Sequence, residues 1–367
     1  MSVSRPAAVI ILAAGAGTRM ESDLPKVLHR ICGRSMLDHV VAAARELDPA
    51  ELIVVVGHCR GQVTSHLAGH APDVRAVVQD RQGGTGHAVR TVLEEVSLGH
   101  GTVVVTYGDA PMLRGRTLAA LVAEHAARGA AATALTTVMD DPTGYGRILR
   151  DADGSIVEIV EEADATSEQR AIREVNSGVY AFEASLLADS VKRLPTNNAK
   201  GEEYLTDVVA ILRAEGHRVA SVLDEDAEEV FGVNDRAQLA LARRTLNGRL
   251  LEHWMRAGVT ITDPLTTAID ADVVIGQDAE IGPGTQLEGS TVIGAGARVG
   301  PGCLLRDTTV GAGATVTHAV CESAVIGAGA AVGPFVHLPP GTRIGPGERL
   351  AGPPGPPGTA RPGGLTT

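Results

Sequence analysis

The apolar positions between residues 7 and 140 fall into short β-branched runs that alternate with segments of helical periodicity. The runs predict strands with the sequences AVIILAAG, ELIVVVGH, VRAVVQD, TVVVTYGD and AATALTTV, and the segments SMLDHVVAAARELD, TGHAVRTVLEEV and TLAALVAEHAARG predict helices. Alternating strands and helices favour a Rossmann-like α/β domain with a mainly parallel sheet that is covered on both faces. Such sheets bind ligands at the carboxyl ends of their strands, so we expect a site in the loops that follow the strands.

The pattern changes after residue 140. In RILRDADGSIVEIVEE, Asp153 and Gly154 join two alternating strands in a predicted hairpin, and the helical segment EYLTDVVAILRAEG and the strand RVASVL come after it. We expect this part to be an insertion that covers one side of the sheet and completes a first domain over residues 1–234. Residues 235–258 predict one amphipathic helix, which is a linker or equally the last helix of that domain; its apolar positions are Leu239, Leu246, Leu250 and Trp254.

From residue 259 to residue 350 the aliphatic residues recur every six positions, with two shifts of phase. Glycine or a small polar residue usually follows each of them. Such a hexapeptide repeat predicts a short left-handed parallel β-helix, in which each aliphatic side chain points into a shared core. The predicted core positions are Ile275, Ile281, Leu287, Ile293, Val299, Leu305, Val310, Val316, Val320, Ile326, Val332, Leu338, Ile344 and Leu350.

The last segment, GPPGPPGTARPGGLTT, predicts a disordered tail over residues 351–367. Proline removes backbone donors and glycine resists ordering, so this segment can neither pair nor pack. Two Gly-Pro-Pro triplets are too few for a collagen helix.

Charge and cysteine content exclude several classes of protein. A formal charge of −12 argues against nucleic-acid binding, and there is no run of about 18 apolar residues that would cross a membrane. The four cysteines show neither a C-x-x-C pair nor zinc spacing, so we expect reduced thiols in a cytoplasmic protein. Only three of the 32 basic residues are lysines, namely Lys26, Lys192 and Lys200. Lys26 is therefore either a chance surface residue or an ammonium selected for phosphate.

The first predicted strand opens into the segment GAGTRMESDLPK. Gly15 and Gly17 allow a tight turn that exposes backbone amides, and Arg19 and Lys26 bring positive charge to the same place, which suits a triphosphate. The motif is weak by itself, because it is neither a Walker loop nor a dinucleotide fingerprint, and a purely structural turn is an equal alternative. At the end of the fourth strand, Asp109 in YGDAP is suited either to hold a magnesium ion against phosphate oxygens or to cap a helix.

Eight motifs occur in the order found in the GlmU family, and the chain resembles that family from Ala8 to Gly347. The motifs are LAAGAGTRMESDLPK, QGGTGHA, YGDAP, DPTGYGRI, IVEEADAT, VNSG, NAKGEEYLTD and GVNDRAQL. The family is bifunctional, with N-acetylglucosamine-1-phosphate uridylyltransferase and glucosamine-1-phosphate acetyltransferase activities. The resemblance implies a nucleotidyltransferase domain followed by a left-handed β-helix.

The resemblance also implies roles for single residues. Arg19 and Lys26 would be the catalytic cations that neutralise phosphates, and Asp109 and Asn234 would hold Mg²⁺. The uridine nucleotide would be bound by Leu12, Ala13, Ala14, Gly15, Gln79, Gly84 and Thr85. The sugar would be bound by Tyr107, Gly108, Gly146, Glu161 and Asn176.

The implied activity is magnesium-dependent transfer of UMP from UTP to N-acetylglucosamine 1-phosphate, in a homotrimer that assembles through the β-helix. Transfer to another sugar 1-phosphate is an alternative, because Ala163 stands where related sugar nucleotidyltransferases often carry a basic residue. A non-catalytic scaffold subunit is a further alternative. The intact set of charged and polar candidate residues argues against a scaffold, since such sets cluster at working sites.

For acetyl transfer the resemblance predicts a negative result. The family's β-helix continues past the length of this chain, into coils that carry its histidine base and its acetyl-coenzyme A site, and Pro339 stands where the family's pattern has an arginine. His318 and His337 remain as candidates for a base, but a lone histidine on a solenoid is more often a surface or stacking residue. We therefore expect no acetyltransferase activity.

Overall fold

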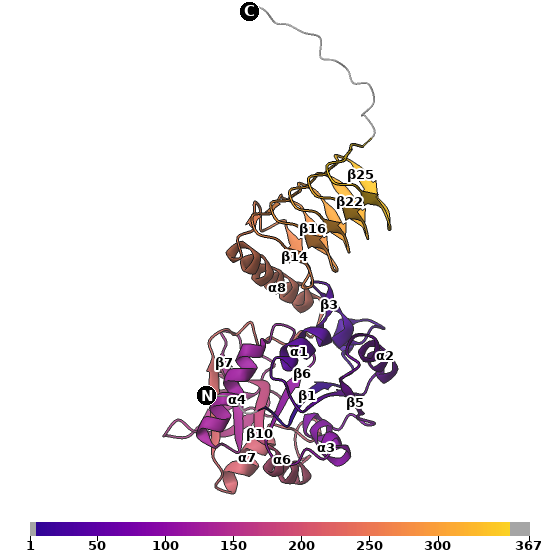
Figure 1. The fold of residues 1–367 in the computed structure, drawn as a ribbon. Coiled ribbons are helices and arrows are strands. Elements are labelled where there is room, and N and C mark those ends of the chain that lie inside the picture. The colour runs from indigo at the N-terminus through magenta and orange to yellow at the C-terminus, as the bar shows by residue number, and fades with distance from the viewer. Residues whose placement is uncertain (1–4, 353–367) are drawn as a thin grey trace, which may run out of the picture. The chain divides into compact units, whose positions relative to one another are not determined.

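The computed structural model describes residues 5–352, and the chain divides into two compact units (Figure 1). The first unit contains the chain up to Arg30 together with Arg34–Ala242, and the second contains Ile31–Gly33 and the chain from Arg243. The division falls within helix α8, Arg236–Arg256, which is the helix predicted over residues 235–258. Residues 353–367, which form most of the predicted tail, lie outside the described residues.

The first unit is built on a nine-stranded sheet with the order β11-β7-β10-β6-β1-β4-β5, and the hairpin β8-β9 joins it through β10. Strands β6, β1, β4 and β5 run parallel to one another and β11 runs parallel to β7, whereas β10 is antiparallel to β6 and β7. The predicted α/β architecture with a mainly parallel sheet is confirmed. The strands are β1 Ala8–Ala13, β4 Glu51–Val56, β5 Arg75–Val78, β6 Thr102–Tyr107, β7 Ala132–Val138, β8 Arg147–Arg150, β9 Ile156–Val160, β10 Glu174–Glu183 and β11 Val219–Asp224.

The segment after residue 140 contributes an interior strand, which corrects the expectation that this segment only covers one side of the sheet. Strand β10 lies between β6 and β7, and eight of its ten residues are buried. Because both faces of β10 are covered, its sequence EVNSGVYAFE lacks the alternation of a half-buried strand. The hairpin predicted at Asp153 and Gly154 is present as β8 and β9.

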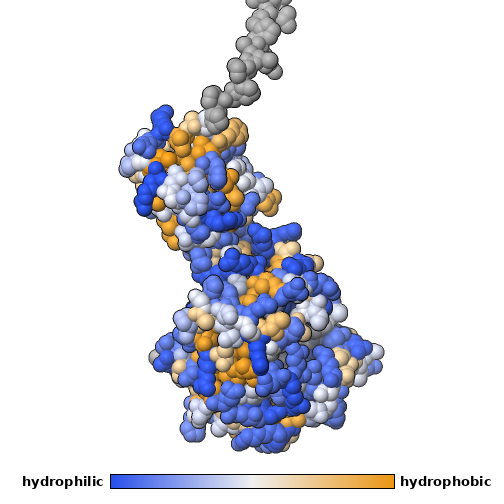
Figure 2. Space-filling model, turned by 90° about the vertical axis from the view of Figure 1, so that its right-hand side faces the viewer, coloured by the Kyte–Doolittle hydropathy of each residue, from blue (hydrophilic) through white to orange (hydrophobic). Residues whose placement is uncertain are grey.

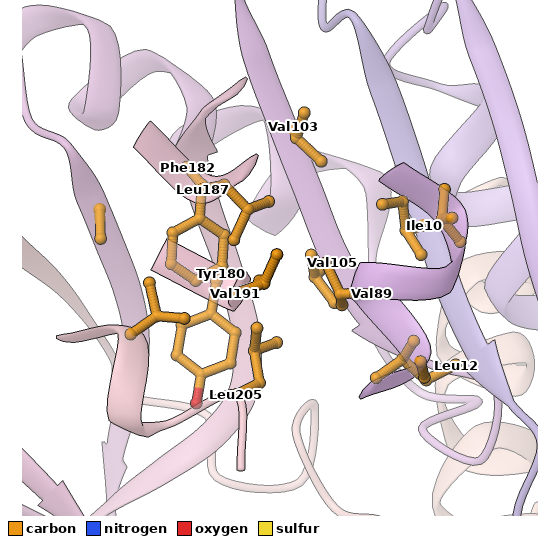
Figure 3. Close-up of a cluster of buried hydrophobic side chains, with 14 of the residues drawn as sticks. Ile10, Leu12, Val89, Val103, Val105, Tyr180, Phe182, Leu187, Val191 and Leu205 are labelled. Atoms are coloured by element: carbon orange, nitrogen blue, oxygen red, sulfur yellow. The ribbon is translucent and has the colours of Figure 1, made fainter. Parts of the chain in front are cut away.

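Helices cover both faces of this sheet, and alternate residues of β1, β4, β6 and β10 enter two separate hydrophobic clusters. Ile10 of β1 belongs to one cluster and Ile11 to the other. Figure 3 shows the first cluster, where Tyr180 and Phe182 of β10 stack at 5.3 Å between ring centroids. None of the helices within the described part of the chain is long and apolar enough to span a bilayer. The helices of this unit are α1 Met36–Arg45, α2 Arg60–His70, α3 Thr85–Glu95, α4 Gly115–Arg128, α5 Ser167–Arg170, α6 Ala184–Ser190 and α7 Asp207–Ala214, with the 3-10 helices η1 Thr18–Met20, η2 Lys26–Leu28 and η3 Val191–Arg193; the short strands β2 Arg30–Ile31 and β3 Arg34–Ser35 pair with each other.

The second unit is a parallel β-helix with three sheets, ordered β12-β15-β18-β21-β24-β27, β13-β16-β19-β22-β25 and β14-β17-β20-β23-β26. This is the arrangement of the predicted left-handed β-helix of hexapeptide repeats. In Figure 2 its surface mixes hydrophobic and hydrophilic residues. Leu251 of α8 belongs to its core, and Trp254 packs against that core. The strands are β12 Thr260–Ile261, β13 Ala268–Ile269, β14 Val274–Ile275, β15 Glu280–Ile281, β16 Gln286–Glu288, β17 Val292–Ile293, β18 Arg298–Val299, β19 Leu304–Arg306, β20 Thr309–Val310, β21 Thr315–Val316, β22 Ala319–Glu322, β23 Val325–Ile326, β24 Ala331–Val332, β25 Val336–Leu338, β26 Arg343–Ile344 and β27 Arg349–Leu350.

One predicted core position of the β-helix is wrong by one residue. Val320 is 40% exposed, and its neighbour Cys321 is fully buried and pairs in register with Leu305 of the preceding coil. The prediction counted only aliphatic residues, whereas a buried thiol also serves as a small apolar group. Burial raises the pKa of Cys321 to about 12, which keeps it neutral. Leu350, another predicted core position, lies on the last described strand and is 37% exposed. Among residues 5–352 it is therefore not buried in the core.

Gly294 lies in the β-helix where no side chain fits. A Cβ at this position would lie 2.5 Å from the backbone nitrogen of Ala312 in the next coil. We therefore expect Gly294→Ala to lower the free energy of unfolding of this unit by about 1–3 kcal/mol. Trp254 is the one tryptophan of the chain and packs against the β-helix core, so its fluorescence during denaturant titration measures the change. Gly61→Ala in α2, where a Cβ meets nothing within 4 Å, is the control; equal Trp254 midpoints for the two variants would contradict the prediction.

Candidate active site

A cavity of about 390 Å³ opens at the carboxyl ends of β1 and β6, the edge at which parallel α/β sheets bind ligands. All seven residues predicted to bind the nucleotide line it. The complete lining is Leu12, Ala13, Ala14, Gly15, Lys26, Val27, Gln79, Gln82, Gly84, Thr85, Ala88, Tyr107, Asp109, Lys200 and Glu202. The predicted site residues outside this lining are Arg19, Gly108, Gly146, Glu161, Asn176 and Asn234.

The two glycines after β1 have different functions. Gly17 adopts a left-handed conformation with φ of 61°, and a Cβ on it would lie 2.6 Å from the Cβ of Lys26. Glycine at this position therefore lets the turn approach Lys26. At Gly15 a Cβ would meet nothing within 4 Å, so the expectation of a tight turn at both glycines holds only for Gly17. The open space beside Gly15 leaves the backbone accessible from the cavity.

Four predicted side chains from three distant parts of the chain meet beside this turn. Lys26 forms an ion pair with Asp109, and its Nζ lies 3.2 Å from Oδ1 of Asn234. Arg19 donates a hydrogen bond of 2.9 Å to the same Asn234 oxygen. The loops that carry the two oxygen-bearing residues are joined, because the backbone nitrogen of Val233 donates to the backbone oxygen of Asp109 at 2.9 Å. The Lys26 and Asp109 side chains are only 14% and 19% exposed, so little water screens their charges.

The oxygens of Asp109 and Asn234 form a donor set that fits magnesium. Both contact Lys26 Nζ, so they converge on one point that a cation already occupies. Magnesium takes oxygen ligands, often one or two carboxylates, and leaves its other positions to water and substrate phosphates. No group of three or more His, Cys, Asp or Glu side chains within residues 5–352 is arranged to hold a metal. A magnesium ion here would therefore take two protein oxygens and depend on an anionic substrate for the rest.

Side-chain amides fix the wall predicted to bind the nucleotide. Nε2 of Gln79 donates to the backbone oxygen of Gly84 at 3.1 Å, and Nε2 of Gln82 donates to the backbone oxygen of Ala14 at 3.0 Å. Gln82 was not predicted as a site residue, although it begins the motif QGGTGHA, because the resemblance assigned only the glycine and threonine of that motif. The lining residues that were not predicted are Val27, Gln82, Ala88, Lys200 and Glu202.

Of the five residues predicted to bind the sugar, only Tyr107 lines the cavity. Gly108 packs beside the side chain of Ala13, and its backbone nitrogen hydrogen-bonds to β1. The backbone nitrogen of Asn176 donates to the backbone oxygen of Gly146 at 2.9 Å, which holds those two residues together outside the cavity lining. The structure thus brings the predicted nucleotide residues onto one surface and leaves most of the predicted sugar residues beside it.

The fifth of these residues, Glu161, lines a second, acidic cavity of about 200 Å³. It accepts a hydrogen bond of 3.1 Å from the Thr206 hydroxyl, and burial raises its pKa. Asp207 lines the same cavity. Burial first, and then the negative charges of Glu161, Glu158 and Asp164, raise the pKa of Asp207 to about 6.

The raised pKa of Asp207 predicts a pH-dependent stability. The folded protein keeps this proton up to about pH 6, whereas the unfolded chain loses it near the ordinary pKa of 3.8. The folded state binds more protons between these values, so the free energy of unfolding falls as the pH rises from about 4 to about 6. Asp207→Asn removes the ionisable group and with it this fall in the free energy of unfolding. In urea titrations, the stability of the variant minus that of the unchanged protein should therefore increase from about pH 4 to about pH 6. Asp189→Asn, at an exposed pair with Lys192, is the control. A constant difference for Asp207→Asn would contradict the prediction.

Comparisons with known proteins agree with this division into a nucleotidyltransferase and a repeat. The sequence model of the MobA-like NTP transferase domain matches residues 9–177, and that of the bacterial transferase hexapeptide, with six repeats, matches residues 272–307. The bifunctional protein GlmU of Streptomyces avermitilis is 58% identical over 347 residues, which are 94% of this chain and 72% of that protein. The protein of the same name from Thermobifida fusca is 57% identical, over 89% of this chain and 68% of that protein. The one from Mycolicibacterium vanbaalenii is 53% identical, over 94% of this chain and 71% of that protein.

Proposed function

This chain belongs to the GlmU family, and from that premise we propose that its first unit transfers UMP from UTP to N-acetylglucosamine 1-phosphate, giving UDP-N-acetylglucosamine and pyrophosphate. The broader class, nucleotidyl transfer, follows from the family and from the NTP transferase domain. The observation that supports the specific reaction is the cluster of Arg19, Lys26, Asp109 and Asn234 beside a cavity lined by every residue predicted to bind the nucleotide.

The proposed reaction depends on charge compensation and not on a general base. A phosphate oxygen of the sugar 1-phosphate attacks the α-phosphorus of UTP, the bond to the bridging oxygen breaks, and pyrophosphate leaves. The attacking oxygen is already anionic, so the main obstacle is the repulsion between two anions. Lys26 and Arg19 supply fixed positive charge, and their contacts with Asn234 hold them in position before the substrates bind.

We further propose that Asp109 and Asn234 hold Mg²⁺ together with substrate phosphates. When bound, the ion would supply Lewis-acid polarisation of phosphate oxygens. Lys26 contacts both oxygens of the donor set, so it would exchange its contact with Asp109 for contacts with phosphate. An ammonium group on a flexible stem with three rotatable donors is suited to that exchange.

The test is pyrophosphate release from folded protein with magnesium, UTP and a panel of sugar 1-phosphates. We expect release with N-acetylglucosamine 1-phosphate, less with glucose 1-phosphate, and none after chelation of magnesium. Replacing UTP by dTTP measures how strictly the cavity selects the nucleotide. A higher kcat/KM for another sugar phosphate would change the substrate within the same reaction, and no release with any sugar phosphate would leave the scaffold alternative.

We propose that the β-helix coils of this chain do not transfer acetyl groups. The ring of His318 packs against Phe335 with 5.5 Å between centroids, and His337 is exposed beside Glu322 at 3.5 Å. A tilted ring contact and a surface contact with a carboxylate account for both histidines, which leaves neither arranged as a base with a substrate pocket in the described coils. Release of coenzyme A from acetyl-coenzyme A with glucosamine 1-phosphate is the measurement, and sustained release by this chain would refute the proposal.

We propose that the β-helix assembles the chain into a homotrimer. Val274 and Val292 are paired neighbours on one sheet of the β-helix and are 53% and 38% exposed, so they offer apolar surface to other copies. Light scattering should give three times the mass of one chain, and Val274→Asp should lower it. A mass of one chain at every concentration would contradict the proposal.

A further inference from the structure

The segment of residues 198–203, here called the Lys200 loop, is held in one conformation by Asn198. Nδ2 of Asn198 donates to the backbone oxygen of Glu202 at 2.6 Å, and its Oδ1 accepts from the backbone nitrogens of Lys200 and Glu202, each at 3.2 Å. These bonds fix the backbone on both sides of Lys200. Its side chain therefore starts from a fixed position at the cavity.

The Lys200 loop joins the nucleotide wall to the segment that carries Glu161. On one side, the backbone of Glu203 exchanges hydrogen bonds with Gly83 and Gly86, both of 2.8 Å. On the other side, the backbone nitrogen of Ala199 donates to Oδ1 of Asp164 at 2.8 Å. Lys200, in the middle of this loop, is therefore held between the nucleotide wall and the segment that carries Glu161.

Lys200 lines the cavity, and its ammonium has no carboxylate within 4 Å among residues 5–352. The other two lysines of the chain are both paired: Lys26 contacts Asp109 inside the cavity, and Lys192 contacts Asp189 at the surface. The charge of Lys200 is felt by Glu161, since it opposes the rise in pKa that burial causes there. A cation that faces a cavity without a carboxylate partner is available to an anionic ligand.

Among residues 5–352, Lys200 is the cation whose charge acts on the pKa of Glu161. The segment of residues 159–166, with the sequence IVEEADAT, has three carboxylates and no basic residue. Arg147 and Arg170 lie nearby, but both pair with Glu162, at 2.7 Å and 3.6 Å. A phosphate dianion that entered from this side would meet a negative environment unless Lys200 compensated its charge.

We propose that Lys200 binds the phosphate of the incoming sugar 1-phosphate, a specificity role that rests on the proposed uridylyl transfer. Lys26 and Arg19 then serve the triphosphate, while Lys200 brings the second anion to the cavity from the Glu161 side. Its ammonium donates to phosphate oxygens and takes no part in bond breaking. Loss of this residue should therefore weaken sugar-phosphate binding and leave UTP binding unchanged.

The experiment compares Lys200→Met and Lys200→Arg with Lys192→Met, a matched lysine outside the cavity. For Lys200→Met we expect KM for N-acetylglucosamine 1-phosphate to rise about fivefold, the upper end of the range for one charge contact at an exposed site, with KM for UTP within about twofold. Lys200→Arg should retain most of the affinity, and Lys192→Met all of it. An unchanged KM for the sugar phosphate, or an equal rise in KM for UTP, overturns the inference.

A binding measurement separates failure of this inference from failure of the proposed uridylyl transfer. If the unchanged protein releases no pyrophosphate with any sugar phosphate, the same three variants are compared by calorimetric binding of N-acetylglucosamine 1-phosphate. Weaker binding by Lys200→Met alone would still support Lys200 as a phosphate-binding residue. Equal binding by all of them, or no binding to the unchanged protein, would overturn it.

Discussion

Lys26→Met should lower the rate of pyrophosphate release by about 10² to 10³, which is the usual cost of one preorganised electrostatic group. The ammonium of Lys26 contacts Asp109 and Asn234 at once, so its removal takes a fixed positive charge away from the phosphates. It also leaves a mostly buried carboxylate, 19% exposed, without its partner. Because the affected interaction is strongest in the transition state, kcat should fall more than KM rises.

Initial rates at saturating UTP and sugar phosphate measure this effect. Lys192→Met is the control, since Lys192 lies at the surface and pairs only with Asp189 among the described residues. Lys26→Arg tests geometry: a guanidinium keeps the charge but is larger than an ammonium and planar, so we expect only partial recovery. Circular dichroism of each variant verifies the fold. A Lys26→Met variant that is folded and retains more than about a tenth of the rate would refute the assigned role.

Glu229→Ala should destabilise the first unit by about 3 kcal/mol, at the lower end of the cost of breaking a buried charge pair. The Glu229 side chain is 3% exposed and accepts a hydrogen bond of 2.6 Å from the Thr117 hydroxyl. It also pairs with Arg114 at 3.1 Å. We expect the lower end of the range because Arg114 is 30% exposed and keeps a second partner, Asp226, at 3.0 Å.

The same substitution should also reduce activity, because Glu229 anchors the loop that leads to Asn234. That loop is also held by the hydrogen bond from the Val233 backbone nitrogen to the Asp109 backbone oxygen, and by a bond of 2.7 Å that the Asn234 backbone nitrogen donates to Oε1 of Gln238. Glu228→Ala is the matched control, since the neighbouring side chain is exposed. Urea titration followed by circular dichroism measures the stability of both. If the two variants unfolded at the same urea concentration, the anchoring role of Glu229 would be wrong.

Secondary structure was predictable where apolar residues form a continuous run or a periodic pattern, and was missed where they form neither. Helix α2 was not predicted, because only Val63 and Leu67 among its eleven residues are buried, too few to form a periodic pattern. Strand β10 was not predicted because Asn176, Ser177 and Gly178 interrupt its apolar residues, whereas the equally buried β1 is a continuous apolar run. In the β-helix, Cys321 took the place predicted for Val320, because a thiol and an aliphatic side chain fill a core equally well.

The candidate site was predictable through its motifs and less so through its geometry. The turn at Gly17 is a local feature, and its approach to Lys26 follows from a segment of a few residues. Gln82 and Lys200 lie within motifs that were recognised, yet nothing in their spacing indicated that they face the same cavity as Lys26. For Glu161 the motif indicated a site residue, but only the structure assigned it to a separate acidic cavity.

The sequence by itself determined the two architectures, since apolar periodicity records which side of a segment is buried and glycine marks the turns between segments. Through its resemblance to the family, it also indicated the residues that we propose hold phosphate and magnesium. Only the tertiary structure decided that Lys26, Asp109 and Asn234 meet at one point and that Lys200 lines the same cavity with no carboxylate partner among residues 5–352. The physical reason is that such meetings depend on strand order and on hydrogen bonds between distant loops, such as the bond from Val233 to Asp109, and these bonds leave no periodic pattern along the chain.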